Sequence, residues 1–304
     1  MDTVTRSEQQ NSVVVVGGSG AVGRLLVDLL RGDGVQVTVV DARAASTSVD
    51  AATATLVGDI TAPDHRVTAA LSTASTIVLA VPESVALSAD LTAVRPDALL
   101  VETLSVKSGY SQYAGRGGHL GPTLGINPMF APSLGMNGRP VAVVVHRPGT
   151  SADAFVDRLQ HWGGRTVLLD AERHDRLAAA TQALTHASVL AFGLALAELD
   201  LPFADIDAVA PPPHTTMLAV LARITGGEPE VYWDVQAGNP HAADARAALH
   251  RATQLLGETV ESGSESEFAE LMNRAGSALG SSADRYRSVC AELFGIVRGS
   301  GDNS

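Results

Sequence analysis

The stretch VVVVGGSGAVGRLL, residues 13–26, joins a run of valines to a glycine-rich loop and the start of an apolar helix. Gly18, Gly20 and Gly23 give the spacing G-x-G-x-x-G. In such a loop the first glycine makes the tight turn, the second lets the backbone approach a pyrophosphate, and the third lets the helix pack closely on the strand. The helix N-terminus then faces the phosphates. The stretch therefore predicts a turn that binds a dinucleotide.

The next β-branched run, residues 35–40, is followed by Asp41. A carboxylate at this point can bind the adenine ribose diol, and its charge repels a 2′-phosphate. We therefore predict NAD as the cofactor, with NADP as the less favoured option because Arg43 is close by. A glycine turn in some other α/β protein is the alternative interpretation. The expected cofactor-binding residues are Gly18, Ser19, Gly20, Ala21, Val22, Gly23, Asp41, Arg43, Val81 and Pro82.

Short β-branched runs alternate with helical patterns over the first half of the chain. Continuous apolar runs are typical of strands buried on both faces, so they predict a parallel sheet with crossover helices. The strand candidates are residues 13–16, 35–40, 55–57, 77–81, 98–101, 141–145 and 166–169. Helical spacing predicts helices over 152–162, 173–199, 216–224, 242–256 and 265–293.

These patterns predict an α/β fold in two domains. Residues 12–170 are expected to form a Rossmann dinucleotide-binding domain, and residues 171–297 an all-helical domain. Residues 1–11 read as a disordered tail, and residues 298–304 as a second tail.

The composition excludes several classes of protein. Acidic residues outnumber basic ones by 33 to 21, so binding to nucleic acid or to an anionic membrane is not expected. A single cysteine, Cys290, excludes a disulfide framework and a cysteine-based zinc site. The longest nearly apolar stretch, 187–199, is shorter than the ~20 residues that span a bilayer. We expect a cytoplasmic protein without a metal site. The pair His174-Asp175 could cap a helix.

Two polar groups follow strand-like segments, at the edge where an open parallel sheet binds its ligands. Ser105 and Lys107 come after the run 98–101, and Lys107 is the only lysine in the chain. Asn127 precedes a proline after another strand-like segment. Taken alone, these patterns more often describe a helix cap beside a solvated lysine and an Asn-Pro turn.

The helical domain offers two further candidates. Gln182 and His186 are four residues apart and so share one helix face, although a histidine in such a helix is more often a satisfied core residue. Arg223 follows an apolar stretch and precedes Tyr232. A guanidinium group suits a carboxylate because it can donate two parallel hydrogen bonds. A surface arginine at a helix end is the alternative.

These pieces occur together in one family: over residues 12 to 295 the sequence resembles the prephenate dehydrogenases. The matching segments are VVGGSGAVGRLL, VETLSVKSGY, LGINPMFAP, ERHDRLAAATQALTHASVLAFGLALAE and LARITGGEPEVYWDV. The resemblance implies a Rossmann domain, a helical domain that dimerises, and an active site in the cleft between them. It also implies hydride transfer from ring C4 of a cyclohexadiene carboxylate to NAD or NADP, followed by loss of CO2 and aromatisation.

The resemblance assigns roles position by position. Ser105 would orient the polar group at ring C4, while His186 and Arg223 would hold the substrate, Arg223 on a carboxylate. We therefore predict Ser105 and Asn127 as the catalytic residues. The predicted substrate-binding residues are Lys107, Gln182, His186, Arg223 and Tyr232.

One position departs from the family. The family's segment His-Pro-Met-Phe-Gly is Asn-Pro-Met-Phe-Ala here, with Asn127 in place of the histidine that takes the proton of the 4-hydroxyl. Asparagine donates and accepts hydrogen bonds but is not a base. Loss of a general base costs about 10²–10⁴ in rate. Either the protein is a poor or inactive homologue, or its substrate does not need that base.

An amine at ring C4 fits the second case, because its lone pair can form an iminium without prior loss of a proton. The chain therefore most resembles the branch that converts 4-amino-4-deoxyprephenate to 4-aminophenylpyruvate in antibiotic pathways leading to 4-aminophenylalanine. The alternatives are a prephenate or arogenate dehydrogenase of tyrosine biosynthesis and a non-catalytic NAD-binding homologue.

Overall fold

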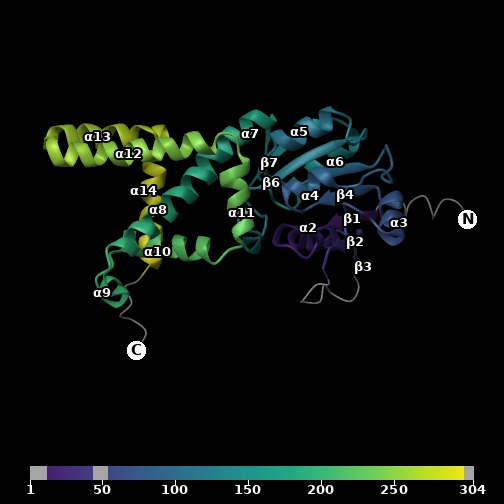
Figure 1. The fold of residues 1–304 in the computed structure, drawn as a ribbon, viewed down its shortest axis with the longest axis horizontal. Helices are drawn as coiled ribbons and strands as arrows, with labels where there is room; N and C mark the ends of the chain where they lie inside the picture. Colours follow the sequence, from purple (N-terminus) through teal and green to yellow (C-terminus); the bar gives the residue numbers. More distant parts are fainter. Residues whose placement is uncertain (1–11, 44–53, 298–304) are drawn as a thin grey trace, which may run out of the picture. The chain divides into compact units, whose positions relative to one another are not determined.

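The computed structural model describes residues 12–43 and 54–297, which form two compact units (Figure 1). The division falls after Ala178. The two predicted tails, 1–11 and 298–304, lie outside the described residues. This division lies later in the chain than the predicted boundary at residue 170, because the helix α7 (Ala171–Ala178) packs on α5 (Ser108–Gly115) and on strand β7 of the first unit.

The first unit is built on an eight-stranded sheet in the order β3-β2-β1-β4-β5-β6-β7-β8. The strands are β1 (Ser12–Val16), β2 (Gln36–Asp41), β3 (Ala54–Val57), β4 (Thr76–Leu79), β5 (Leu99–Glu102), β6 (Thr123–Pro128), β7 (Pro140–Arg147) and β8 (Arg165–Leu169). Neighbouring strands are parallel except β6 and β7, which are antiparallel. The predicted parallel sheet with crossover helices was therefore wrong at this one pair, where the connection 129–139 holds no crossover helix.

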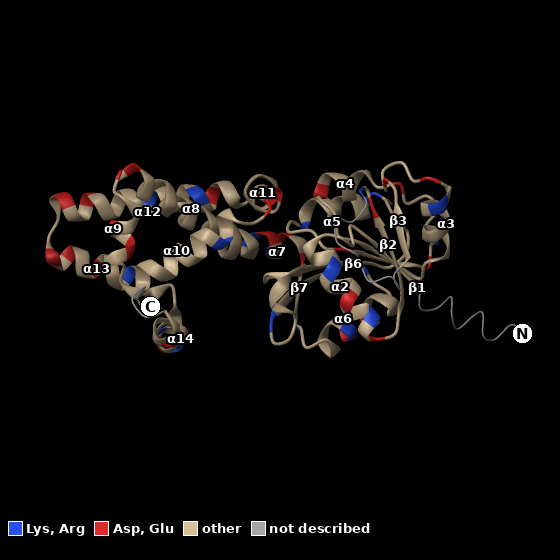
Figure 2. Cartoon of the chain, turned by 90° about the horizontal axis from the view of Figure 1, so that it is seen from below, with Lys and Arg blue, Asp and Glu red and all other residues tan. Residues whose placement is uncertain are grey.

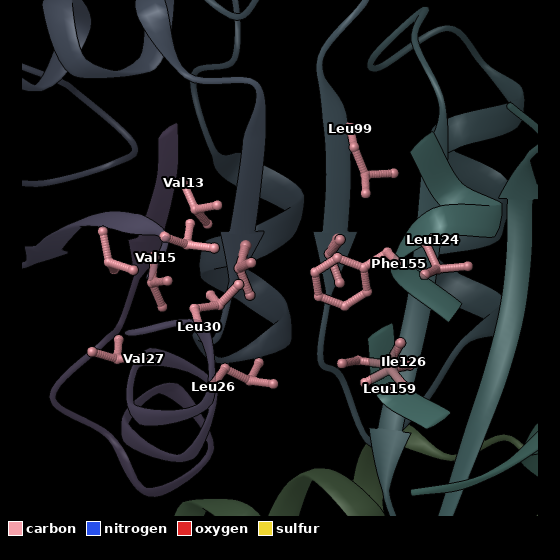
Figure 3. Packing of buried hydrophobic residues seen from close by; sticks show 14 of the residues in the cluster. Val13, Val15, Leu26, Val27, Leu30, Leu99, Leu124, Ile126, Phe155 and Leu159 are labelled. Atoms are coloured by element: carbon pink, nitrogen blue, oxygen red, sulfur yellow. The ribbon is translucent and has the colours of Figure 1, made fainter. Parts of the chain in front are cut away.

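The valines of β1 show why the sheet is buried on both faces. Val13 and Val15 join one apolar cluster, and Val14 and Val16 join the other, as the two-residue period of a strand requires. Helix α2 (Ala21–Gly32) and helix α6 (Thr150–His161) cover the first face, where Leu26 and Phe155 are buried (Figure 3). Helix α3 (His65–Thr73) contributes to the second cluster, as do α4 (Glu83–Ser88) and α5.

The second unit is all helical. Its helices are α8 (Leu184–Glu198), α9 (Phe203–Ala208), α10 (Pro212–Thr225), α11 (Pro229–Trp233), α12 (Ala242–Ser262), α13 (Glu265–Ser277) and α14 (Ala283–Ile296). The predicted helices over 173–199 and 265–293 are both interrupted. A π-helical turn, Ala179–Ala183, separates α7 from α8, and Gly280, at φ +52°, lies between α13 and α14.

The run from Ala171 to Glu198 is long and apolar enough, by length and composition alone, to cross a membrane. The longest nearly apolar stretch, 187–199, is shorter than that length. The first turns of this run, however, belong to the sheet unit, where His174 and Asp175 are buried, so this part of the run is packed against protein. The absence of a membrane span therefore remains a prediction.

Candidate active site

In the glycine-rich loop after β1, the backbone comes very close to neighbouring backbone atoms at two glycines, Gly17 and Gly23. Gly17 has φ +78°, and a Cβ there would lie 2.1 Å from the carbonyl oxygen of Ala80. A Cβ at Gly23 would lie 2.1 Å from Gly17 O, so Gly23 lets α2 pack onto the turn. The tight turn is thus made by Gly17 and not by Gly18, which instead packs against Val39. The sequence motif missed Gly17 because two glycines are adjacent.

The rest of the loop fits a dinucleotide. Gly20 is exposed at the N-terminus of α2, and a Cβ on it would meet only Gly17 O, at 3.3 Å. The buried Ser19 hydroxyl has no hydrogen-bond partner among the described residues, while the Ser19 amide donates to Asp41 Oδ2 at 2.9 Å. The carboxylate therefore lies beside the loop, as a ribose contact requires. Arg43 is exposed just beyond it.

The predicted site residues of the first unit lie at one edge of its sheet. Strands β1, β4, β5 and β6 run parallel, so their carboxyl ends meet there. The glycine loop follows β1, and Val81 and Pro82 follow β4, with Val81 Cγ1 2.9 Å from where a Gly17 Cβ would be. Ser105 follows β5, and Asn127 lies near the end of β6. This edge is where open parallel sheets bind ligands.

Ser105 is partly exposed, and its hydroxyl makes no hydrogen bond within the described part of the chain. Helix α5 begins at Ser108, so Ser105 is not its N-cap. Its hydroxyl is therefore available to a ligand.

Lys107 is fully buried, which does not fit the predicted direct contact with substrate. Its ammonium donates to Glu102 Oε2 at 2.7 Å and to the carbonyl oxygen of Ile126 at 2.8 Å. Burial opposes ionisation of Glu102, but Lys107 and a hydrogen bond from His146 hold its pKa below the ordinary value. The lysine thus joins the segment after β5 to β6, one residue before Asn127.

Asp175 holds the other end of the same segment. Its Oδ1 accepts from the Lys107 amide at 2.8 Å, and its Oδ2 accepts from the Ser108 amide at 2.9 Å and from the Ser108 hydroxyl. Burial would raise the pKa of Asp175, but these hydrogen bonds and one from His174 lower it. Asp175 therefore caps a helix, as its sequence suggested, but the helix is α5 and not its own.

Asn127 lies inside β6 and not in a turn after a strand. Its side chain is 3% exposed, and its Nδ2 lies 3.1 Å from Nε2 of His174. His174 Nδ1 lies 2.8 Å from Asp175 Oδ1. His174 was the functional neighbour that sequence reasoning missed, because 47 positions separate it from Asn127. Its only signal was the adjacent acid.

The helical unit gathers the remaining predicted residues. The rings of His186 and Tyr232 meet edge to face at 4.9 Å. Burial, together with the nearby positive charge of Arg223, lowers the pKa of His186. Gln182 lies in the π-helical turn, a feature frequent at functional sites. Among the described residues, neither Gln182 Oε1 nor His186 Nδ1 has a hydrogen-bond partner, although both are buried.

This second cluster can bind an anion. Arg223 is exposed in the last turn of α10, where its guanidinium group is free to reach a carboxylate. In the view of Figure 2, Arg residues are interspersed with Asp and Glu along both units. In the part of the chain that the structure describes, no group of three or more His, Cys, Asp or Glu side chains is arranged to hold a metal ion.

Comparisons with known proteins agree with this geometry. The family model for the prephenate dehydrogenase dimerization domain matches residues 170–274, and that of the NAD dependent epimerase/dehydratase family matches residues 13–94. The chain is 48% identical over 287 residues to 4-amino-4-deoxyprephenate dehydrogenase from Streptomyces pristinaespiralis, covering 92% of this chain and 95% of that protein. The chain belongs to the prephenate dehydrogenase family.

More distant relatives and solved structures extend the match. T-protein from Enterobacter agglomerans is 29% identical, covering 96% of this chain and 73% of that protein. The prephenate dehydrogenase of A. aeolicus, solved with hydroxyphenyl propionate and NAD+, has a TM-score of 0.67 at 17% identity over 88% of this chain and 96% of that one. Synechocystis arogenate dehydrogenase has a TM-score of 0.60 at 20% identity, covering 90% and 99%.

The predicted fold class, family and dehydrogenase activity are thus confirmed. The match to the dimerization domain of the family, residues 170–274, covers most of the helical unit that was predicted to dimerise.

Proposed function

We propose that the protein catalyses the NAD-dependent oxidative decarboxylation of 4-amino-4-deoxyprephenate to 4-aminophenylpyruvate. The observation that carries this proposal is Asn127, a residue without basic character at the place where the family has a histidine. The relative from Streptomyces pristinaespiralis, which bears the name of this activity, is 48% identical over 92% of the chain.

The chemistry of an amine explains why a base is not needed. As hydride leaves ring C4, the nitrogen lone pair forms a C=N bond and gives an iminium. The bond from ring C1 to the carboxylate then breaks, its electrons enter the ring, and the nitrogen recovers its lone pair. The products are CO2 and an aromatic amine, and the amine keeps both its protons. Bound NAD supplies the hydride acceptor.

Asn127 and Ser105 act on the C4 nitrogen. As positive charge develops there, its N–H bonds become stronger donors, so a hydrogen bond to the amide oxygen of Asn127 strengthens in the transition state. Interactions that strengthen in this way accelerate the reaction. The free hydroxyl of Ser105, following the adjacent strand, orients the same group.

The other contacts follow from the two clusters. Asp41 beside the glycine loop favours NAD over NADP. Arg223 binds a substrate carboxylate, and His186, Gln182 and Tyr232 complete that site. We place the protein in the cytoplasm as a homodimer formed through the helical unit. Large apolar side chains left exposed on that unit in the single chain, such as Val260 and Met272, support the dimer.

The test is NADH formation by the purified protein with 4-amino-4-deoxyprephenate and with prephenate. We expect kcat/KM to favour the amine by about 100-fold or more, which is about 2.7 kcal/mol of transition-state discrimination. Asn127→His should raise the turnover of prephenate and reduce this preference.

Asn137→His, at an exposed position, is the matched control and should leave the preference unchanged. A wild-type preference for prephenate would make the protein an ordinary prephenate or arogenate dehydrogenase. No turnover of any cyclohexadiene, with NAD still bound, would leave a non-catalytic homologue.

A further inference from the structure

Asp175, His174 and Asn127 form a chain of hydrogen bonds that ends at the proposed reaction centre. Asp175 Oδ1 lies 2.8 Å from His174 Nδ1, and His174 Nε2 lies 3.1 Å from Asn127 Nδ2. All three side chains are buried, with 0, 1 and 3% exposed. The three residues therefore form one internal structure and not a surface contact.

The donors around Asp175 decide which imidazole nitrogen carries the proton. Its carboxylate already accepts from the amides of Lys107 and Ser108 and from the Ser108 hydroxyl. An ionised carboxylate can only accept, so His174 Nδ1 must carry a proton. The atom of Asn127 that faces Nε2 is the amide nitrogen, which can only donate, so Nε2 is the acceptor of this hydrogen bond.

This arrangement fixes the orientation of the Asn127 amide. Its nitrogen is committed to His174, and its oxygen accepts no hydrogen bond from any described residue. The Lys107 ammonium holds the carbonyl of Ile126, so the preceding peptide is held as well. Asn127 therefore offers a ligand its Oδ1.

The orientation determines whether Asn127 helps or hinders the reaction. With Oδ1 toward ring C4, the amide accepts from the substrate N–H and supports the developing charge on nitrogen. With Nδ2 toward ring C4, the amide would donate to the nitrogen lone pair and withhold the electrons that expel the hydride. A free amide could adopt either orientation.

We propose that the His174–Asp175 pair is a positioning device that holds Asn127 with its amide oxygen toward the ring C4 substituent. The proposal rests on the proposed function. In that function Asn127 replaces a histidine, and His174 gives the Asn127 amide the orientation in which it can accept from the substrate amine. His174 is thereby a residue that determines specificity without touching the substrate.

Two substitutions of His174 separate positioning from packing. His174→Leu removes both imidazole nitrogens, whereas Asp175 keeps its bonds to Lys107 N and Ser108. We expect kcat for the amine to fall about 10- to 100-fold, with KM for NAD unchanged. His174→Gln puts an amide oxygen near the position of Nε2, and it should recover most of that loss.

A double-mutant cycle with Asn127→Ala measures whether the loss of kcat in His174→Leu depends on the Asn127 amide. A purely structural role of His174 would give the same loss with or without that amide. If His174 acts through Asn127, His174→Leu should have little further effect in the Asn127→Ala background. An equal loss in both backgrounds would overturn the proposal. The cycle uses whichever cyclohexadiene the wild type turns over, so a preference for prephenate would refute the proposed function but not this coupling.

Nitrogen-15 NMR of the histidine side chains tests the same arrangement without activity. Comparison with His174→Gln identifies the signals of His174 among the nine histidines. We expect a neutral ring protonated at Nδ1. A ring protonated at Nε2, or at both nitrogens, would overturn the proposal.

Discussion

The glycine loop and the surroundings of Asn127 lie at the same edge of one sheet but are held in place differently. The loop is set by backbone contacts so close that a Cβ at Gly17 or Gly23 would lie 2.1 Å from a carbonyl oxygen. Asn127 is set by a buried network of charged and polar side chains that starts at Glu102 and Asp175. The first arrangement tolerates no added atom. The second depends on hydrogen bonds between side chains, so in our proposal a change of the group at position 127 changes the substrate preference.

The largest effect on stability is expected when a charge is removed from the buried network around Asn127. Lys107→Met leaves the buried carboxylate of Glu102 without its cation, which typically costs about 3–5 kcal/mol. We expect the free energy of unfolding, measured by urea denaturation, to fall by that amount. The matched control is Arg95→Met, which breaks the exposed pair with Asp97 and should leave the free energy of unfolding nearly unchanged, because water screens that pair. Equal losses in the two variants would show that the network does not stabilise the unit.

The loop can be tested by adding a single carbon atom. In Gly23→Ala the new Cβ must displace Gly17 O, so we expect a loss of about 1–3 kcal/mol of stability. Affinity for NAD, measured by calorimetry, should fall with it, because α2 can no longer pack onto the turn. Gly32→Ala at the end of the same helix meets no atom within 4 Å and should be neutral or slightly stabilising. An unchanged affinity in Gly23→Ala would contradict the loop assignment.

The smallest effect concerns the choice of cofactor. Asp41→Asn removes the charge that would repel a 2′-phosphate, and the ratio of kcat/KM for NADP to that for NAD should rise about tenfold, or about 1.4 kcal/mol. Asp28→Asn removes the same charge at an exposed position of α2 and controls for the overall change. If both variants shift the ratio equally, the effect is long-range and Asp41 does not face the ribose.

Much of the fold followed from local patterns. The alternation of valines in β1 and the spacing of apolar residues in α2 each fall within one element, so the sequence indicates them directly. The antiparallel pairing of β6 with β7 and the breaks after Ala178 and Ser277 did not follow. They depend on connection geometry and on contacts of α7 with the sheet unit, which no short window contains.

The features of the candidate site likewise fall into those indicated by the local sequence and those that depend on tertiary packing. By itself, the sequence determined the dinucleotide loop, the acid at the end of β2 and the replacement of a base by Asn127, because each is a property of a residue and its neighbours in the chain. Only the tertiary structure decided that Lys107 is buried and that His174 faces Asn127. Those facts arise from the packing of α7 against the segment that follows β5. Hydrogen bonds between residues so far apart in the chain exist only once that packing has formed.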